Sequence, residues 1–167
     1  MQINSARLLI DKLKRDDASF IIKLLNQPSF LEMIGDRKVH DTASAITFME
    51  EGPWQTYPEN IGMLCVRNKE TGEAIGLCGF MQRDYLNSPD LGYAFLESTH
   101  GQGYAIEAAQ AVMLWGKSLN QFRTIGAMTN KNNVASIGLL AKLDFVEMKT
   151  ENLCDELKGL RYFERQI

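Results

Sequence analysis

Two glycines in a short polar turn are the residues whose spacing most directly suggests chemistry. Gly101 and Gly103 follow an apolar stretch, residues 91–96, and precede a helix predicted from Tyr104 to about Lys117. A glycine turn lets backbone N–H groups point at an anion because no Cβ intervenes, and a helix N-terminus favours negative charge. The pattern is typical of a phosphate site, although such a glycine pair can also serve only as a connection.

Three features beside the turn favour the phosphate site. Residues 91–96 are apolar at almost every position, as in a strand that is covered on both faces. A second strand and a second helix are predicted directly afterwards, over residues 123–128 and 133–142. Small residues follow Glu107 and allow the predicted helix to pack close to a sheet, namely Ala108, Ala109, Ala111 and Val112.

Other nucleotide-binding motifs do not fit the turn. The sequence contains no G-x-x-x-x-G-K-[ST]. Ile106 occupies the position of the third glycine of G-x-G-x-x-G, where only alanine is a usual substitute. We therefore do not expect a nucleotide-binding site of either kind.

The order of the motifs resembles that of the GNAT superfamily of acetyl-CoA-dependent N-acetyltransferases. The shared order is a strand, x-G-x-G-x-A, a glutamate, an alanine-rich helix, a short strand, N-x-x-S at a helix start, and L-x-F. The family's pyrophosphate-binding pattern falls on residues 100–105, with His100 in place of its Gln or Arg. This change affects one side-chain contact and leaves the backbone contacts intact. The GQGYA segment is similar to the RimJ/RimL branch, whose better-known members acetylate N-terminal amines of ribosomal proteins.

The resemblance implies which residues hold acetyl-CoA. In the family, the strand before the turn offers its backbone to the pantetheine arm, and the N–H near Phe95 would face the thioester oxygen. Asn133 of the N-x-x-S motif either bonds the pantetheine amide as well as capping its helix, or only caps it. The implied cofactor-binding residues are Tyr93, Ala94, Phe95, Gly101, Gln102, Gly103, Tyr104, Ala105, Ile106 and Asn133.

The resemblance also implies two catalytic residues, Asp90 and Ser136. Ser136, one turn after the start of its helix, would reach the cofactor sulfur. Many relatives carry a thiolate-protonating tyrosine at the position of Leu140, so here Ser136 or water must serve. Asp90, at the head of the strand before the turn, resembles in position a carboxylate that some relatives use as a base through a water. The alternatives for the base are Asp84, Glu97, His40 and His100.

The hydrophobic patterns, together with the resemblance, predict a single GNAT domain over residues 1–167. The expected fold is α+β or α/β, with a central, mixed but mostly antiparallel twisted sheet of about seven strands and about four flanking helices. The expected strands are residues 7–13, 60–67, 73–82, 90–96, 123–128, 144–150 and 159–166, the last with one face in water. Two further helices are expected to start at Asp16 or Asp17 and at Asp41 or Thr42, with a helical turn over residues 30–34 and a stop by Gly52 and Pro53.

Composition and charge exclude several classes of protein. A formal net charge of −3 argues against a dedicated nucleic-acid binder. No apolar run approaches the roughly 20 residues that span a bilayer, and the first residues do not resemble a signal peptide, so we expect a cytoplasmic protein with no membrane partner. Cys65, Cys78 and Cys154 lack metal-ligand or disulfide spacing, and no metal is predicted.

Two classes of function fit these observations. The first is an N-acetyltransferase that moves the acetyl group of acetyl-CoA to a primary amine by direct attack in a ternary complex. The amine would belong to a protein N-terminus, such as that of a ribosomal protein, or to a small molecule, and the enzyme would be a monomer or a homodimer. The second is a non-catalytic acyl-CoA-binding or sensing module. Trp54 and Tyr57 either border the acceptor groove or belong to the core.

Overall fold

An eight-stranded sheet forms the centre of the computed structural model, which describes residues 1–149 and 155–167. Neighbouring strands are antiparallel except β5 and β6, which are parallel. The prediction of a mixed, mostly antiparallel sheet is confirmed, with eight strands in place of about seven. In sheet order the strands are β1 (Gln2–Asn4), β2 (Leu8–Asp11), β3 (Gly62–Asn68), β4 (Ala74–Met81), β5 (Asp90–Phe95), β6 (Thr124–Asn130), β8 (Leu160–Gln166) and β7 (Val146–Met148).

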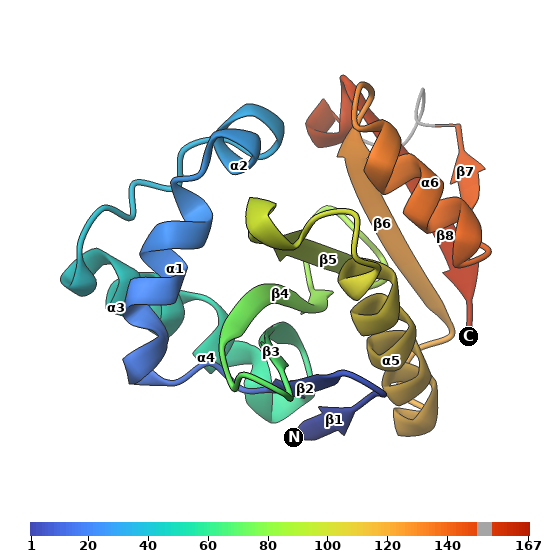
Figure 1. Cartoon of the computed structure of the whole chain (residues 1–167). Helices are drawn as coiled ribbons and strands as arrows, with labels where there is room; N and C mark the ends of the chain where they lie inside the picture. Colours follow the sequence, from blue (N-terminus) through green and yellow to red (C-terminus); the bar gives the residue numbers. More distant parts are fainter. Residues whose placement is uncertain (150–154) are drawn as a thin grey trace.

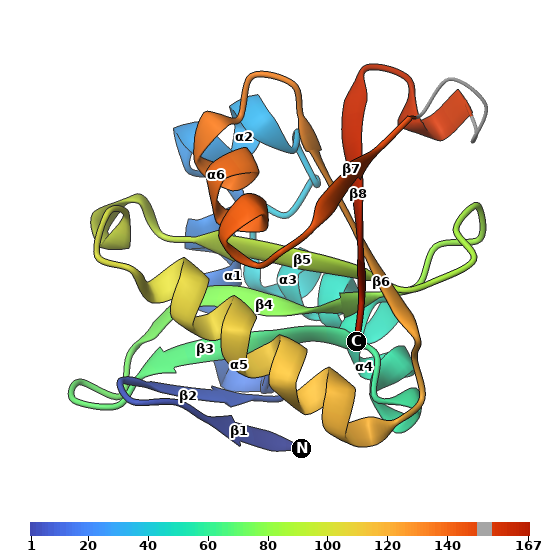
Figure 2. The same ribbon diagram turned by 90° about the vertical axis from the view of Figure 1, so that its right-hand side faces the viewer.

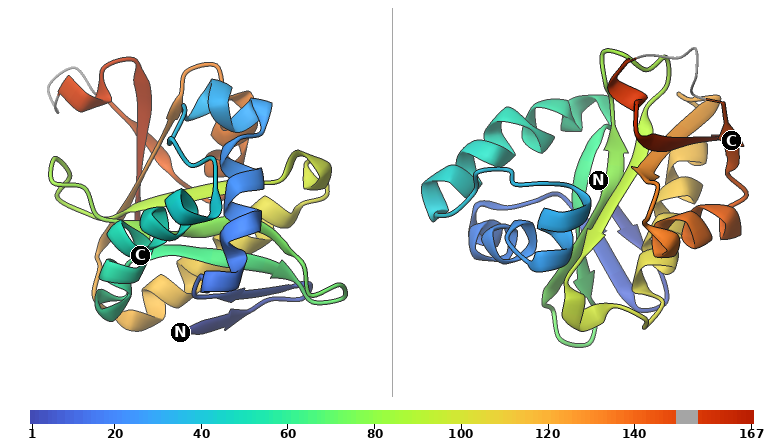
Figure 3. Two further views of the ribbon diagram at one scale, coloured as in Figure 1. Left: turned by 90° about the vertical axis from the view of Figure 1, so that its left-hand side faces the viewer. Right: turned by 90° about the horizontal axis from the view of Figure 1, so that it is seen from above.

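Helices cover both faces of the sheet (Figures 1 and 3). One face carries α1 (Ala18–Leu25), α2 (Pro28–Met33), α3 (Thr42–Glu51) and α4 (Pro53–Thr56). The other face carries α5 (Tyr104–Leu119) and α6 (Val134–Lys142). Two hydrophobic clusters fill the space between these layers and the sheet. The predicted helices correspond to the four longer ones, α1, α3, α5 and α6.

Helix α5 lies close against the sheet because its inner face is made of small residues. Ala108, Ala109 and Val112 are fully buried. A Cβ at Gly116 would come within 2.6 Å of the ring of Phe80, a buried residue of β4. That ring also stacks on Trp115, with the ring centroids 5.9 Å apart. The close packing fixes the direction of α5 and therefore the place of its N-terminus.

Several details at the start of the chain differ from the prediction. Strand β1 was not predicted, because its three residues are too few to show an alternating pattern. Asp17 does not cap α1; its carboxylate accepts hydrogen bonds from the Lys14 N–H and the Arg67 guanidinium instead. Pro28 begins α2 as well as ending α1, since proline suits the first helical position.

The predicted ends of α3 and β7 can also be compared with the structure. The cap on α3 is confirmed, because Asp41 Oδ1 accepts from the Ser44 N–H at 2.8 Å. Residues after Gly52 were expected to leave the helix, but Pro53 starts the short helix α4. The strand predicted over residues 144–150 is β7, which is shorter, and residue 150 and Cys154 lie outside the described residues.

The prediction that the last strand shows one face to water is wrong at its centre. Tyr162 and Phe163 are both buried, although they point to opposite faces of β8. Phe163 packs in the same hydrophobic cluster as residues of α5 and α6, and the Tyr162 ring lies over Gly126 of β6, which has no side chain. Alternation in sequence could not reveal that both faces are covered.

Candidate functional site: a glycine turn beside two diverging strands

The glycine turn has the backbone geometry that was expected of it. Gly101 and Gly103 have φ angles of +75° and +80°, a region that favours glycine over residues with a Cβ. Nothing lies within 4 Å of the place where a Cβ of Gly101 would stand. Gly103 is the N-cap of α5 and has no side chain to bond the first N–H groups of the helix. Open space and uncapped amides fit a phosphate group.

Arg7 and Glu107 brace this turn from the β1–β2 connection, 100 residues away in sequence. Glu107 accepts hydrogen bonds at 2.7 Å from Arg7 Nε, from the Arg7 backbone N–H and from the Ser5 hydroxyl. The Arg7 guanidinium also donates to the Gln102 carbonyl at 3.0 Å and lies 4.4 Å from the ring centroid of Tyr104. The brace places a cation at the turn. Sequence reasoning singled out Glu107 but missed Arg7.

Glu107→Gln is expected to loosen the brace. Partial burial acts to raise the pKa of Glu107, but the hydrogen bonds from Arg7 and Ser5 outweigh it and lower the pKa below its ordinary 4.5. The ionised form is therefore favoured in the folded state, and its stabilisation is present above pH 4.5 and lost as the pH falls through the folded-state pKa. We expect a loss of about 1–2 kcal/mol in unfolding free energy at pH 7, because these bonds involve charged groups at a partly exposed site.

Denaturant unfolding at pH 7 and at pH 3, together with acetyl-CoA titration, measures this effect. The matched control is Glu147→Gln, which breaks an exposed pair with Arg161 on β8. The control is expected to change stability by less than about 1 kcal/mol and to leave acetyl-CoA binding unchanged. Equal behaviour of the two variants would show that the brace does not support the turn.

Strands β5 and β6 form the other part of the site, because they diverge beside the turn. Their register pairs only Asp90 with Gly126, at the beginning of β5, and β6 then leaves β5 at a steep angle (Figure 2). The Leu96 N–H bonds the Ile75 carbonyl of β4 at 2.9 Å. Since N–H groups alternate sides along a strand, those of Tyr93 and Phe95 point to the opposite edge, toward β6. This edge offers backbone donors to an extended ligand.

His100 and Gln27 fix the end of β5. His100 Nε2 lies 3.1 Å from the Phe95 carbonyl oxygen, which also accepts from Gln27 Nε2 at 2.7 Å. The His100 ring therefore turns toward the strand. Gln27 also accepts from the Glu97 N–H at 3.0 Å and so joins the α1–α2 junction to the turn.

The N-terminus of α6 brings Asn133 and Ser136 to the side of β5 from which Tyr93 projects. Asn133 Oδ1 accepts from the Ser136 N–H at 3.0 Å, which confirms its capping role. Ser136 is 9% exposed, and its Oγ lies 2.7 Å from the Tyr93 hydroxyl oxygen. The structure thus joins two residues that were predicted for different roles.

Asp90 lies apart from these groups. It is 1% exposed, and its carboxylate accepts from Arg83 Nε at 2.8 Å. Burial raises the pKa of Asp90 and outweighs the opposing effect of the Arg83 guanidinium. Five residues of strand, about 16 Å, separate Asp90 from Phe95. Asp90 also points to the face opposite Tyr93, because side chains alternate along β5.

The alternative bases have varied surroundings. Asp84 is exposed. His40 is also exposed, and its Nδ1 lies 2.9 Å from Asn26 Oδ1. Glu97 accepts from the Ser29 N–H at 2.8 Å, and this bond lowers its pKa. His100 contacts the Phe95 carbonyl as described above.

Trp54 and Tyr57 act as core residues. Trp54 Nε1 donates to the Leu13 carbonyl at 2.9 Å. The Tyr57 hydroxyl accepts from the Leu13 N–H and donates to the Met63 carbonyl. Burial raises the pKa of Tyr57, so this hydroxyl stays protonated.

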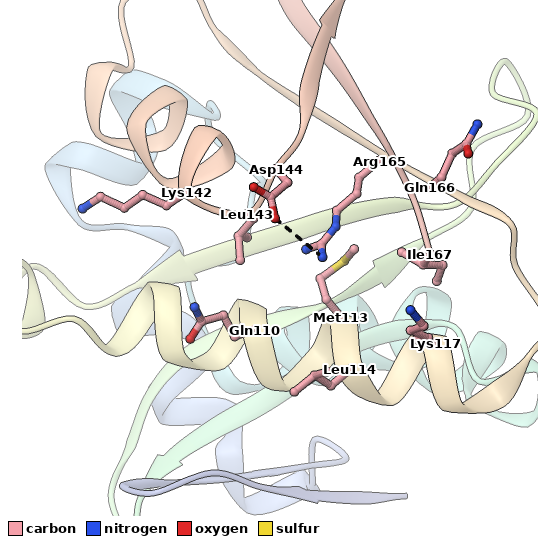
Figure 4. Close-up of a pocket in the computed structure, with 10 residues that line it drawn as sticks. All are labelled: Gln110, Met113, Leu114, Lys117, Lys142, Leu143, Asp144, Arg165, Gln166 and Ile167. Atoms are coloured by element: carbon pink, nitrogen blue, oxygen red, sulfur yellow. Dashed lines mark ion pairs between the residues drawn. The ribbon is translucent and has the colours of Figure 1, made fainter.

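A pocket of about 360 Å³ lies elsewhere, between α5, the end of α6 and the end of β8 (Figure 4). None of the predicted cofactor-binding residues lines it. Its lysines, Lys117 and Lys142, belong to the last turns of their helices, where cations are favoured by the helix dipole. Among residues 1–149 and 155–167 there is no cluster of His, Cys, Asp and Glu that could hold a metal ion, and no helix is long and apolar enough to cross a membrane.

The diverging strands and the glycine turn are the two features that the resemblance to N-acetyltransferases implied for the cofactor site. Residues 7–146 match the family model of the acetyltransferase (GNAT) domain, and the chain belongs to this family of acetyltransferases. Members of the family use acetyl-CoA, and the open glycine turn fits its pyrophosphate.

Known proteins show the same relationship. N-acetyltransferase p20 of Bacillus licheniformis is 26% identical over 140 residues, which cover 83% of this chain and 79% of the relative. An acetyltransferase structure from Agrobacterium tumefaciens has a TM-score of 0.83 at 20% identity, covering 99% of this chain and 94% of that one. RimL, the ribosomal L7/L12 alpha-N-protein acetyltransferase, has a TM-score of 0.79 at 17% identity, with coverage of 100% and 94%. The resemblance to the RimJ/RimL type is thus confirmed at the level of the fold.

Proposed function

We propose that this protein transfers the acetyl group of acetyl-CoA to a primary amine by direct attack in a ternary complex. The observation that carries the proposal is the braced glycine turn at the N-terminus of α5, beside a strand edge with outward N–H groups. The first feature suits the pyrophosphate, and the second suits the pantetheine amides and the thioester. The proposed contacts to acetyl-CoA are Tyr93, Ala94, Phe95, Gly101, Gln102, Gly103, Tyr104, Ala105, Ile106 and Asn133.

Three groups of this chain would carry the chemistry. Bound acetyl-CoA supplies an activated thioester carbonyl. The Phe95 N–H would donate to the oxygen on which negative charge develops. The Ser136 hydroxyl would donate a hydrogen bond to the sulfur as it departs. A base must remove a proton from the incoming ammonium. We propose Asp90 for this role, with the proton passed along a chain of several water molecules, because five residues of strand separate Asp90 from Phe95.

The role of Asp90 can be tested by the pH dependence of kcat/KM in Asp90→Asn. If Asp90 is the base, the rate falls by at least about tenfold, and the acidic limb of the profile disappears. An unchanged acidic limb, in a variant that still binds acetyl-CoA, would assign the proton to another group. The control is Asp16→Asn, which neutralises an exposed carboxylate that is not a candidate for the base.

For the acceptor, we propose a protein or peptide N-terminus. The support is the fold shared with RimL, whose name describes an alpha-N-protein acetyltransferase. Thiol release from acetyl-CoA would be measured with peptides that have free N-termini, the same peptides with blocked N-termini, a polyamine and an amino sugar. Release with only the free peptides supports this acceptor. Release with only the polyamine or the amino sugar would replace it by a small molecule.

The second candidate is the acyl-CoA-binding or sensing module. It is favoured by Leu140, which is 1% exposed in the core at the place of the usual tyrosine. Binding of acetyl-CoA without thiol release for any amine in the panel would support it.

A further inference from the structure

The hydrogen bond between Tyr93 and Ser136 joins the two elements that separate beside the site. Tyr93 lies on β5 and Ser136 on α6, which follows β6, so the bond connects the sides of the divergence between these strands. The oxygen atoms are 2.7 Å apart, and the Ser136 carbonyl oxygen lies 3.4 Å from the same phenol. The pair is therefore at the place where the thioester sulfur is proposed to lie.

The surroundings of Ser136 favour the phenol as the donor. The Ser136 N–H is already bonded to Asn133, which fixes the backbone at the start of α6. Both Ser136 oxygen atoms can accept from the phenol, whose single proton is better placed on Oγ at 2.7 Å than on the carbonyl oxygen at 3.4 Å. Burial raises the pKa of Tyr93 to about 12, and the phenol therefore keeps its proton throughout the physiological range.

A phenol that donates to Ser136 Oγ changes what the serine hydroxyl can do. A serine in a helix often donates to a backbone carbonyl in the preceding turn. With its lone pair engaged by Tyr93, the Ser136 hydroxyl is held in one orientation, and its own proton is left for another acceptor. Hydrogen bonds in such a chain also strengthen one another.

We propose that Tyr93 is a positioning residue that orients the Ser136 hydroxyl toward the sulfur of coenzyme A. This inference rests on the proposed acetyl transfer and names the group that compensates for Leu140. Tyr93 acts through Ser136 and need not lose its proton. The hydrogen bond from Ser136 stabilises the thiolate as it forms.

The test compares Tyr93→Phe, Ser136→Ala and the double variant. The readout is the pKa of the thiol of bound coenzyme A, followed by the ultraviolet absorbance of its thiolate, and kcat is measured in parallel. In the wild-type protein this thiol pKa is expected to lie about one pH unit below that in either variant, which corresponds to one hydrogen bond to a charged atom. We expect kcat to fall about tenfold in each single variant and no further in the double variant.

Several outcomes would overturn the inference. Additive effects of the two substitutions, or a thiol pKa that is unchanged in Tyr93→Phe and altered in Ser136→Ala, would show that Tyr93 does not act through Ser136. Coenzyme A binding and the unfolding midpoint, measured on the same samples, separate these results from a loss of fold. Ser136→Ala removes the oxygen atom on the other side of the bond and can be measured even if Tyr93→Phe is unstable. An unaltered thiol pKa in Ser136→Ala would also contradict the proposal.

Tyr85→Phe is the matched control for the loss of a tyrosine hydroxyl. Its hydroxyl lies 3.9 Å from Met128 Sδ, and it is expected to leave the thiol pKa and kcat unchanged. The proposed function fails separately, if the wild-type protein releases no thiol with any amine. A wild-type enzyme that turns over without coupling between Tyr93 and Ser136 refutes only this inference.

Discussion

Gly103→Glu is expected to weaken acetyl-CoA binding by at least about 100-fold in isothermal titration. The φ angle of Gly103 is +80°, so any side chain strains the turn by about 1–2 kcal/mol. The added carboxylate also lies where the pyrophosphate is proposed to bind. Two unit charges about 4 Å apart near a protein surface repel by about 4 kcal/mol, which exceeds two orders of magnitude in Kd.

The control for this variant is Gly72→Glu in the turn between β3 and β4. Gly72 has a φ angle of +74°, and nothing lies within 4 Å of a Cβ placed there. It therefore receives the same charge and a similar backbone strain away from the site. We expect wild-type affinity from Gly72→Glu. Wild-type affinity in Gly103→Glu would show that the glycine turn is only a connection.

Arg83→Met is expected to cost about 3 kcal/mol of unfolding free energy at pH 7. The substitution removes the partner of Asp90, which is 1% exposed and accepts from Arg83 at 2.8 Å. An unpaired carboxylate in the interior is far less favourable than a paired one, and breaking such pairs costs about 3–5 kcal/mol. The lower figure applies here because the Arg83 side chain is 28% exposed.

The loss in Arg83→Met is expected to depend on pH in a defined direction. Burial already raises the pKa of Asp90, and without Arg83 only a hydrogen bond from its own backbone N–H opposes that effect. The folded state then binds a proton more tightly than the unfolded state. The loss of unfolding free energy in Arg83→Met is full above the folded-state pKa of Asp90. It shrinks as the pH falls toward 3.8, the ordinary pKa of an aspartate.

Denaturant unfolding between pH 4 and pH 8 measures this dependence. Lys158→Met, which breaks the exposed pair with Asp155, is the control and is expected to change stability by less than about 1 kcal/mol at every pH. A deficit in Arg83→Met that stays constant with pH would mean that Asp90 does not carry the effect.

The parts of the fold that could be predicted are those with local signals. Helix α5 has a glycine turn before it and a face of small residues, and strands β3 to β5 are apolar runs separated by turns. Strand β1 and helix α4 have only three and four residues, too few for a periodic pattern. The burial of Phe163 depends on the core cluster against which β8 packs, and the sequence of β8 alone does not reveal that contact.

The candidate site divides in the same way. The positive φ angles of Gly101 and Gly103 follow from residue type, as does the capping of α6 by Asn133. The brace from Arg7 could not be predicted, because it joins residues 100 positions apart. The bond between Tyr93 and Ser136 likewise depends on the angle at which α6 crosses β5.

One incubation tests the central claim most directly. The protein, acetyl-CoA and a peptide with a free N-terminus are mixed, and all products are identified by mass spectrometry. The account predicts equal amounts of free coenzyme A and of peptide carrying one acetyl group on its N-terminal amine, with no acetylated protein intermediate. The contradicting result is unchanged peptide and intact acetyl-CoA, with the same outcome for every other amine tested. If the protein nevertheless binds acetyl-CoA in titration, it is a binding module and not an acetyltransferase.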